Sequence, residues 1–410
     1  MTAKSLLIVG AGLTGLYASI LAARRGASVR LIAEGRGGLA LSHGCIDIWR
    51  DGDLRFSIGR LERGHPLRQA GLASIETALA AFLDLMHEAP LAYVGGMGRI
   101  WRLPTALGAA HTTAGVPVSL AGGSLDDARP IHIGHIPGLR DFSAELAAAG
   151  MRRLGTNVRG TIELPLPGGP PARDLYPHDI GVLLEGADFL ETTARQWKTR
   201  MRGVTRLGIP AVAGRDRSLH VFAALEAILG VELFEIPTLP PSLPGLRLER
   251  ALRRLAVDSG VDLIEGPSAR GEIDGRSGGR LVLGTLASTA GGPRSYRAQT
   301  VLLATGGPLH GGWLSFANGE VQEAVFGLPI DCLLDRDEWT APAIVDEQPY
   351  ALLGLNVDGD FRPCDRRGRP YFANLFAAGG LLAGADRTRE GSRQGIDLAT
   401  AYCAVGAALS

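Results

Sequence analysis

Three glycines that follow an apolar run constrain this chain more than any other feature of its sequence. They are Gly10, Gly12 and Gly15, in the stretch LLIVGAGLTGLYASILAARRG. Gly10 allows a tight turn, Gly12 lets the backbone approach a pyrophosphate, and Gly15 lets a helix pack closely on a strand. The N-terminus of such a helix offers unpaired N–H groups and the positive end of its dipole to a phosphate. The spacing therefore predicts a nucleotide-binding site.

The segments around these glycines form a βαβ unit. Residues 4–9 predict a buried parallel strand, residues 13–25 a helix of small residues, and residues 28–33 a second strand. Glu34 stands at the end of that strand, at about the 20-residue spacing expected of an acid that binds a ribose hydroxyl. This context favours a dinucleotide over a glycine-rich helix entry without a ligand.

A later strand ends in a second glycine motif. The run TVLLATGG, residues 300–307, predicts a buried strand that ends at Thr305 and Gly306. Flavoproteins of the two-dinucleotide-binding type commonly end a strand in this way where the chain passes the flavin nucleotide. The alternative is an ordinary strand-to-loop glycine pair.

The last part of the chain carries the third motif. NLFAAGG predicts a strand followed by Gly380, and a final helix is expected to begin near Ser392, with Arg393 and Gly395 in its first turn. In this class of flavoprotein the N-terminus of such a helix points at the isoalloxazine ring. Its positive end and Arg393, a candidate catalytic residue, would stabilise an anionic reduced flavin. The three motifs in this order favour FAD, with NAD as sole cofactor as the alternative.

Two loops supply weaker candidates. Ser42 and His43, in SHGCID, are expected near the flavin, with Ser42 binding the cofactor and His43 acting as an acid–base group. A mere polar contact is the alternative for His43, and Cys45 is expected to pack. Arg140 is the third catalytic candidate because its forked guanidinium suits a phosphate or carboxylate. Its alternative is a structural contact with Asp141.

The order of the motifs predicts an α/β fold of the two-dinucleotide-binding type, in which a discontinuous Rossmann-like FAD domain receives an inserted α+β substrate or cap domain. We assign residues 1–90, 240–315 and 345–410 to the FAD domain. Residues 91–239 form the insertion, and residues 316–344 are expected to pack on it. The proline-rich string PTLPPSLPGLRL, which should lack regular structure, marks the crossing between the domains.

Composition narrows the class of protein. The 42 basic residues balance the 42 acidic ones, so net charge gives no attraction to nucleic acid or anionic lipid. The four cysteines form no CxxC pair, which argues against a zinc or iron–sulfur site, and we predict no metal site. So few cysteines suggest a reducing compartment. No uncharged apolar run reaches the ~18 residues of a spanning helix.

Longer stretches resemble a known family, the B subunit of anaerobic glycerol-3-phosphate dehydrogenase. They are GGLALSHGCIDIWRDG, LPTALGAAHTT, HIPGLRDFSAELAAAG, PTLPPSLPGLRL, LLATGG and NLFAAGGLLAG, and they span nearly the whole chain. The resemblance implies a larger flavoprotein A subunit and an iron–sulfur C subunit that links the complex to membrane quinone. It implies oxidation of sn-glycerol 3-phosphate to dihydroxyacetone phosphate, in the cytoplasm, peripheral on the inner membrane through the partners.

The family resemblance and the sequence motifs imply different flavin cofactors. The family's B subunit is usually described with FMN, whereas Gly10, Gly12, Gly15 and Glu34 favour FAD. The flavin-facing loops also lack a clear acid–base pair. Two alternatives therefore stay open: a stand-alone flavin dehydrogenase of a small hydroxy acid or polyol, and a non-catalytic structural partner of another flavoprotein.

Overall fold

The computed structural model describes residues 4–169, 174–277, 280–330 and 335–410. The chain divides into two compact units. Unit 1 comprises Met1–Gly38, Asp47–Phe82 and Leu252–Ser410, and unit 2 comprises Leu39–Ile46 and Leu83–Ala251. Unit 1 is thus discontinuous in sequence.

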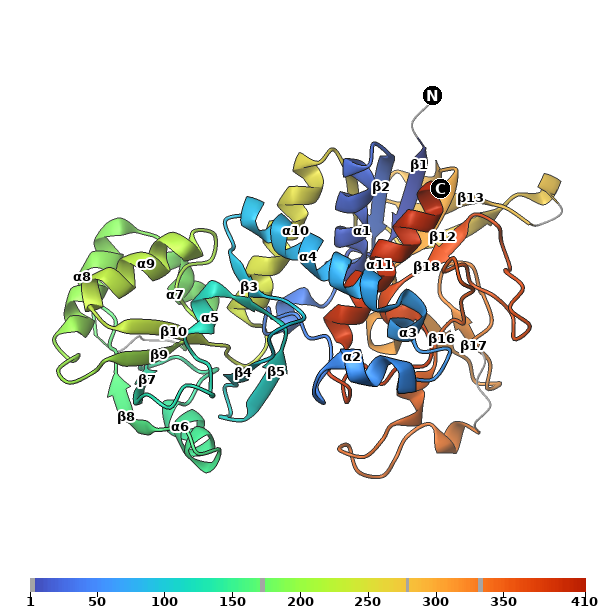
Figure 1. Cartoon of the computed structure of the whole chain (residues 1–410). Helices are drawn as coiled ribbons and strands as arrows, with labels where there is room; N and C mark the ends of the chain where they lie inside the picture. Colours follow the sequence, from blue (N-terminus) through green and yellow to red (C-terminus); the bar gives the residue numbers. More distant parts are fainter. Residues whose placement is uncertain (1–3, 170–173, 278–279, 331–334) are drawn as a thin grey trace. The chain divides into compact units, whose positions relative to one another are not determined.

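Unit 1 is built on a five-stranded parallel sheet in the order β11-β2-β1-β15-β18 (Figure 1). The bounds are β1 Ser5–Val9, β2 Ser28–Ala33, β11 Asp262–Glu265, β15 Thr300–Leu303 and β18 Leu375–Ala377. Leu6 and Leu7 of β1 pair with Thr300 and Val301 of β15, although β1 ends at Val9 and the two strands are far apart in the sequence. The sequence analysis placed β1, β2, β15 and β18 within a residue or two.

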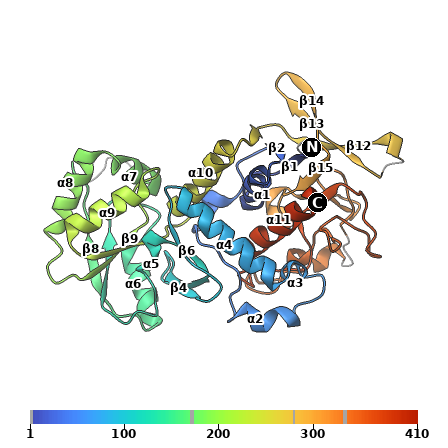
Figure 2. The ribbon, with the colours of Figure 1, turned by 45° about the horizontal axis from the view of Figure 1, so that its top comes forward.

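Two helices of small residues lie side by side against this sheet (Figures 1 and 2). They are α1, Leu13–Arg24, and α11, Arg393–Leu409. Both carry buried alanines and glycines, which let the helix axes approach closely, so the apolar character of α11 on nearly all sides reflects burial rather than a membrane span. None of the helices in the described ranges is long and apolar enough to cross a membrane.

The rest of unit 1 surrounds this layer. The bounds are α2 Leu54–Ser57, α3 Pro66–Ala70, α4 Leu72–Glu88, β12 Ala269–Ile273, β13 Val282–Thr289, β14 Gly292–Arg297, β16 Trp313–Ser315 and β17 Val321–Glu323. Strands β12 to β14 form an antiparallel meander. The boundary between the units falls inside α4.

Residues 316–344 were predicted to pack on the insertion. In the structure they belong to unit 1 instead. The Gly271 N–H of the meander donates to the Val325 carbonyl oxygen at 2.7 Å. A Cβ at Gly271 would lie 2.1 Å from the Phe326 ring. The segment therefore packs on the meander of unit 1; residues 331–334 lie outside the described ranges.

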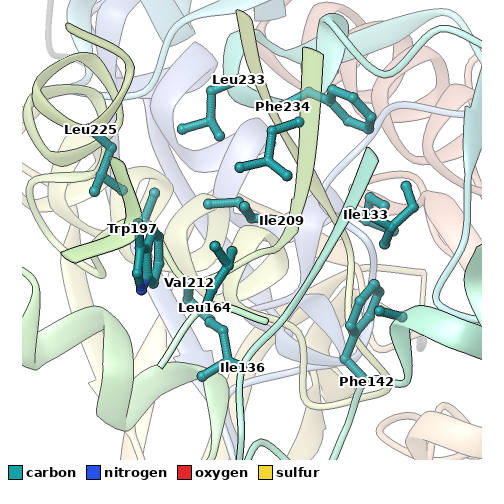
Figure 3. Packing of buried hydrophobic residues seen from close by; sticks show 14 of the residues in the cluster. Ile133, Ile136, Phe142, Leu164, Trp197, Ile209, Val212, Leu225, Leu233 and Phe234 are labelled. Carbon is teal, nitrogen blue, oxygen red and sulfur yellow. The ribbon is translucent and has the colours of Figure 1, made fainter. Parts of the chain in front are cut away.

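Unit 2 contains a four-stranded parallel sheet in the order β10-β9-β7-β8 together with two antiparallel strand pairs, β3-β6 and β4-β5. Its strands are β3 Tyr93–Gly95, β4 Trp101–Pro104, β5 Ala110–Thr113, β6 Gly115–Pro117, β7 Ile131–His135, β8 Val158–Glu163, β9 Arg206–Pro210 and β10 Glu232–Ile236. Its helices are α5 Val118–Ala121, α6 Ala144–Arg153, α7 Pro177–Leu183, α8 Ala187–Lys198 and α9 Ser218–Leu229. Figure 3 shows its core, where Trp197, Ile209 and Leu225 pack together.

Helix α10, Leu243–Asp258, begins inside the string that was expected to lack regular structure. Pro244 lies in its first turn, where the missing N–H of proline has no helical partner to lose. The boundary between the units lies after Ala251, within α10, rather than at residue 240. The prolines therefore lie at the start of the helix and do not mark the boundary between the two units.

A buried ion pair links α10 to the sheet of unit 2. Arg247 donates to both carboxylate oxygens of Glu235, at 2.6 and 3.0 Å, and its Nε donates to the Gly214 carbonyl oxygen at 2.8 Å. Burial alone would raise the pKa of Glu235, but the Arg247 charge and the hydrogen bonds outweigh it and lower the pKa. Removing either partner would leave an uncompensated buried charge, which typically costs about 3–5 kcal/mol.

Glu323 of β17 makes the stability of unit 1 depend on pH. Burial raises the pKa of its carboxyl from 4.5 to about 7, although the N–H groups of Phe326 and Val325 donate to it and oppose the shift. A raised folded-state pKa favours the folded chain fully below the unfolded-state pKa, and that contribution is lost as pH rises through the folded value.

We therefore expect the Glu323→Gln variant to gain free energy of unfolding relative to wild type between pH 5 and pH 8, by up to ~3 kcal/mol. Urea unfolding of both proteins at the two pH values measures this. The exposed Glu320→Gln variant is the matched control and should follow wild type. Parallel pH dependences for Glu323→Gln and wild type would contradict the assignment.

Candidate functional site

The strand order of unit 1 reverses at β1, with β2 on one side and β15 on the other. In open parallel sheets, ligands bind outside the carboxyl ends of the strands at such a switch point. Gly10 follows β1 here with a φ of +112°, and a Cβ on it would lie 2.2 Å from the Ala304 carbonyl oxygen. A Cβ at Gly15 would lie 1.8 Å from the Gly10 carbonyl oxygen. Packing therefore requires both glycines.

Gly12 is different, because it faces open space. No atom lies within 4 Å of the position that its Cβ would occupy, among the described residues. Gly12 is the N-cap of α1, and no side chain caps the helix there. Because Gly12 has no side chain to cap the first-turn N–H groups, these groups can face a ligand, which agrees with the predicted pyrophosphate contact.

The loop after β2 approaches the same helix end. A Cβ at Gly37, where φ is +77°, would lie 2.9 Å from the Gly12 Cα. Glu34 stands at the end of β2 with its side chain exposed, where a ribose hydroxyl could reach it. The glycine-rich loop therefore lies against the phosphate end of the predicted site.

Thr305 and Gly306 follow β15 at the switch point. The Thr305 hydroxyl is buried and has no hydrogen-bond partner among the described residues. Gly306 has a φ of +81°, and a Cβ on it would lie 2.9 Å from the Cβ of His310. The His310 ring also contacts Gly38, whose Cβ would lie 2.7 Å from the ring Nε2. Burial and the nearby Arg387 charge lower the pKa of His310.

The N-terminus of α11 combines functional and structural residues. Ser392 is fully buried and donates through Oγ to Glu390 at 2.8 Å, and His65 contacts the same Glu390 carboxylate at 3.1 Å. The Gly395 N–H donates to the Asp47 carbonyl oxygen at 2.8 Å. A Cβ at Gly395 would lie 2.9 Å from the Ile48 Cα. Both predicted cofactor ligands thus serve the packing of this segment.

Arg393 donates to the Thr388 hydroxyl at 2.6 Å. Desolvation and the neighbouring Arg387 charge lower the pKa of Arg393. Gly380 lies against Arg387, because its Cβ would be 2.0 Å from the Arg387 Nη1. The structure thus places two guanidinium groups at the flavin end of the predicted site.

The remaining candidates lie in unit 2. The Ser42 hydroxyl donates to the Leu39 carbonyl oxygen at 2.7 Å and accepts from the Gly44 N–H at 3.2 Å, within a tight turn. His43 accepts from the Cys45 N–H at 3.1 Å, and its ring lies 3.9 Å, between centroids, from the ring of His111.

Arg140 is exposed and ion-paired. Its Nη1 donates to Asp174 at 2.5 Å, and this bond raises the pKa of Arg140. The structural partner is therefore Asp174 rather than the neighbouring Asp141. Cys45 is buried in a core cluster with Trp101 and Val116, as expected of a packing residue.

Sequence reasoning missed Thr14, His310, Arg387 and Asp397. Asp397 accepts a hydrogen bond from the Thr14 hydroxyl at 2.9 Å and one from Arg387 Nη2 at 2.5 Å. One signal was present: Asp397 follows Arg393 at the i,i+4 spacing that places two side chains on one helix face. No local pattern could have brought Thr14 of the first helix to Asp397 of the last.

Comparison with known proteins identifies the ligand. The model of the FAD binding domain family matches residues 5–396. A probable B subunit of anaerobic glycerol-3-phosphate dehydrogenase from Halobacterium salinarum is 32% identical over 99% of this chain and 97% of its own length. The B subunit of anaerobic glycerol-3-phosphate dehydrogenase from Vibrio cholerae is 29% identical over 97% of this chain and 94% of its own length. FAD is therefore the cofactor.

The residues at the switch point fit FAD. The open space at Gly12 and the uncapped α1 suit a pyrophosphate. The buried Thr305 hydroxyl lacks a partner among the described residues, and a bound nucleotide could supply one. Arg387 provides a cation near the N-terminus of α11. These residues therefore offer separate groups for the pyrophosphate and for the flavin of FAD.

We expect Gly12→Val to lose bound FAD while keeping the wild-type fold, because the new side chain enters the space where the pyrophosphate must approach. Gly15→Ala should instead destabilise the fold by ~1–3 kcal/mol, since its methyl group collides with the Gly10 carbonyl. FAD absorbance per chain and urea unfolding separate the two effects.

Gly64→Ala is the control for these substitutions, because its Cβ would meet no atom within 4 Å. It should keep both FAD and stability. A Gly12→Val protein with full FAD occupancy would overturn the pyrophosphate assignment.

Proposed function

We propose a function for this chain on the premise that it belongs to the FAD binding domain family and, within it, to the family of anaerobic glycerol-3-phosphate dehydrogenase B subunits. It is a flavoprotein subunit of a quinone-linked glycerol-3-phosphate dehydrogenase. The complex oxidises sn-glycerol 3-phosphate to dihydroxyacetone phosphate and relays electrons to an iron–sulfur subunit and quinone. The observation that carries the proposal is near-full-length similarity to relatives named as this subunit, joined to a switch point that fits FAD.

Different residues at the carboxyl edge of the sheet would bind the two ends of FAD. The N–H groups of the first turn of α1, beyond Gly12, would hold the pyrophosphate, and Glu34 the adenosine ribose. Thr305 would donate its buried hydroxyl to the nucleotide, and the N-terminus of α11 would face the flavin. FAD would supply a two-electron acceptor that can pass electrons on singly.

Oxidation of a secondary alcohol also needs a group that accepts the hydroxyl proton. His43 is the candidate, since an imidazole nitrogen is the commonest proton acceptor in general-base catalysis. Its Nδ1 accepts the Cys45 N–H at 3.1 Å, which fixes the orientation of the ring. Arg140 stays a candidate for the substrate phosphate, provided that the phosphate displaces Asp174.

The cofactor released from the denatured chain should have the mass of FAD rather than FMN, because Glu34 and the glycine loop after β2 are positioned for an adenosine half. Mass spectrometry of the released cofactor decides this. Release of FMN would remove the role of Glu34. A colourless chain that still assembles with its partners would favour the structural-partner alternative.

The chain assembled with its A and C partners should reduce a dye acceptor with sn-glycerol 3-phosphate and not with glycerol. His43→Gln should lower kcat by about 10²–10⁴, the usual contribution of a general base, with FAD content unchanged. His87→Gln, at the exposed end of α4, is the matched control. Dye reduction by the isolated chain with a different hydroxy acid or polyol, and none by the complex with sn-glycerol 3-phosphate, would contradict the proposal.

A further inference from the structure

Arg387 lies flat against the backbone that follows β18. A Cβ at Gly380 would lie 2.0 Å from Arg387 Nη1, so only glycine leaves room for the guanidinium there. A Cβ at Gly307, after β15, would lie 2.9 Å from the Gly380 carbonyl oxygen. Arg387 therefore lies where the carboxyl ends of β15 and β18 meet, beside the switch point that fits FAD.

The position of this guanidinium is fixed from one side. Arg387 Nη2 donates to Asp397 at 2.5 Å and to the Arg393 carbonyl oxygen at 2.7 Å. Asp397 also accepts from the Thr14 hydroxyl at 2.9 Å, and Thr14 is buried in the first turn of α1. One carboxylate thus joins the two helices whose N-termini face the cofactor.

The Nε donor of Arg387 differs from Nη2. It is buried and has no hydrogen-bond partner among the residues that the structure describes, whereas the side chain as a whole is 20% exposed. A guanidinium carries five N–H donors in a rigid fork. A nearly buried cation with an unpaired donor favours a ligand with acceptor atoms and negative charge.

Arg393, the cation expected from the sequence, is held differently. Its Nη2 donates to the Thr388 hydroxyl rather than to the Asp397 carboxylate. Arg389, in the same segment, points to solvent with 51% of its side chain exposed and pairs with Glu347. Of these three arginines, Arg387 is the one that is oriented by a carboxylate and lies on the glycine backbone.

We propose that Arg387 is the cation that donates hydrogen bonds to the flavin end of bound FAD, and that Asp397 and Thr14 are the residues that position it. Two electrons and one proton reduce FAD to a form that carries an extra negative charge on its ring, and the Arg387 charge stabilises that form relative to the oxidised one. The proposal rests on FAD binding within the proposed function and is independent of the substrate that is oxidised.

The test is the two-electron midpoint potential of the FAD-loaded full chain, measured by redox titration without substrate. Arg387→Gln should weaken binding of reduced relative to oxidised FAD by about tenfold or more, and tenfold corresponds to a potential about 30 mV lower. Arg389→Gln, the matched control, should keep the wild-type potential. Thr14→Val, which removes a hydrogen bond to Asp397 without changing the charge, should shift the potential in the same direction, because the anchor of the guanidinium is loosened.

A second pair of variants keeps the test decisive if Arg387→Gln does not fold or loses its FAD. Arg387→Lys keeps the charge and should stay closer to the wild-type potential, whereas Gly380→Ala displaces the guanidinium and should lower it. FAD-loaded variants at Arg387 and Gly380 that all share the potential of Arg389→Gln would overturn the proposal. A complex that is inactive on sn-glycerol 3-phosphate, with the potential shift intact, would contradict only the proposed function.

Discussion

The close approach of Gly10 to Ala304 is the contact on which unit 1 depends. Strands β1 and β15 come from opposite ends of the discontinuous unit, and their carboxyl ends meet only because residue 10 lacks a Cβ that would lie 2.2 Å from a carbonyl oxygen. That meeting creates the switch point of the sheet and aims the start of α1 along its edge. The second glycine motif, at Thr305 and Gly306, lies beside the first because this contact brings β15 next to β1.

Helices α1 and α11 are linked by a shared carboxylate as well as by packing. Asp397 of α11 accepts hydrogen bonds from Thr14 of α1 and from Arg387, so one carboxylate connects the first turn of α1 to the first turns of α11 and to Arg387. Small residues let α1 and α11 pack directly on one another, which shortens the distance that this carboxylate must span. A change that moves α1 therefore also moves the cation near α11.

The sequence predicted the parts of the fold that follow from local patterns. Apolar runs that end in glycine located β1, β15 and β18 within a residue or two, since buried parallel strands read as continuous apolar runs. Contacts between distant segments were beyond such patterns. Gly395 packs on Ile48, which lies where its side chain would be, and Arg140 pairs with Asp174 from another loop. The prolines around Pro244 were read as a break, yet a proline in the first turn starts a helix as readily as it ends one.

Local charge, and not net charge, decides what this chain binds. The acidic and basic residues cancel over the whole sequence, and screening limits the influence of exposed charges to roughly 8 Å at physiological ionic strength. Around the start of α11, however, Arg387 and Arg393 lie close enough for each to matter to the other, since the Arg387 charge contributes to the lowered pKa of Arg393. Asp397 compensates part of this positive charge and uses its hydrogen bonds to orient Arg387. The remaining positive charge therefore lies near the N-terminus of α11, although the chain as a whole carries no net charge.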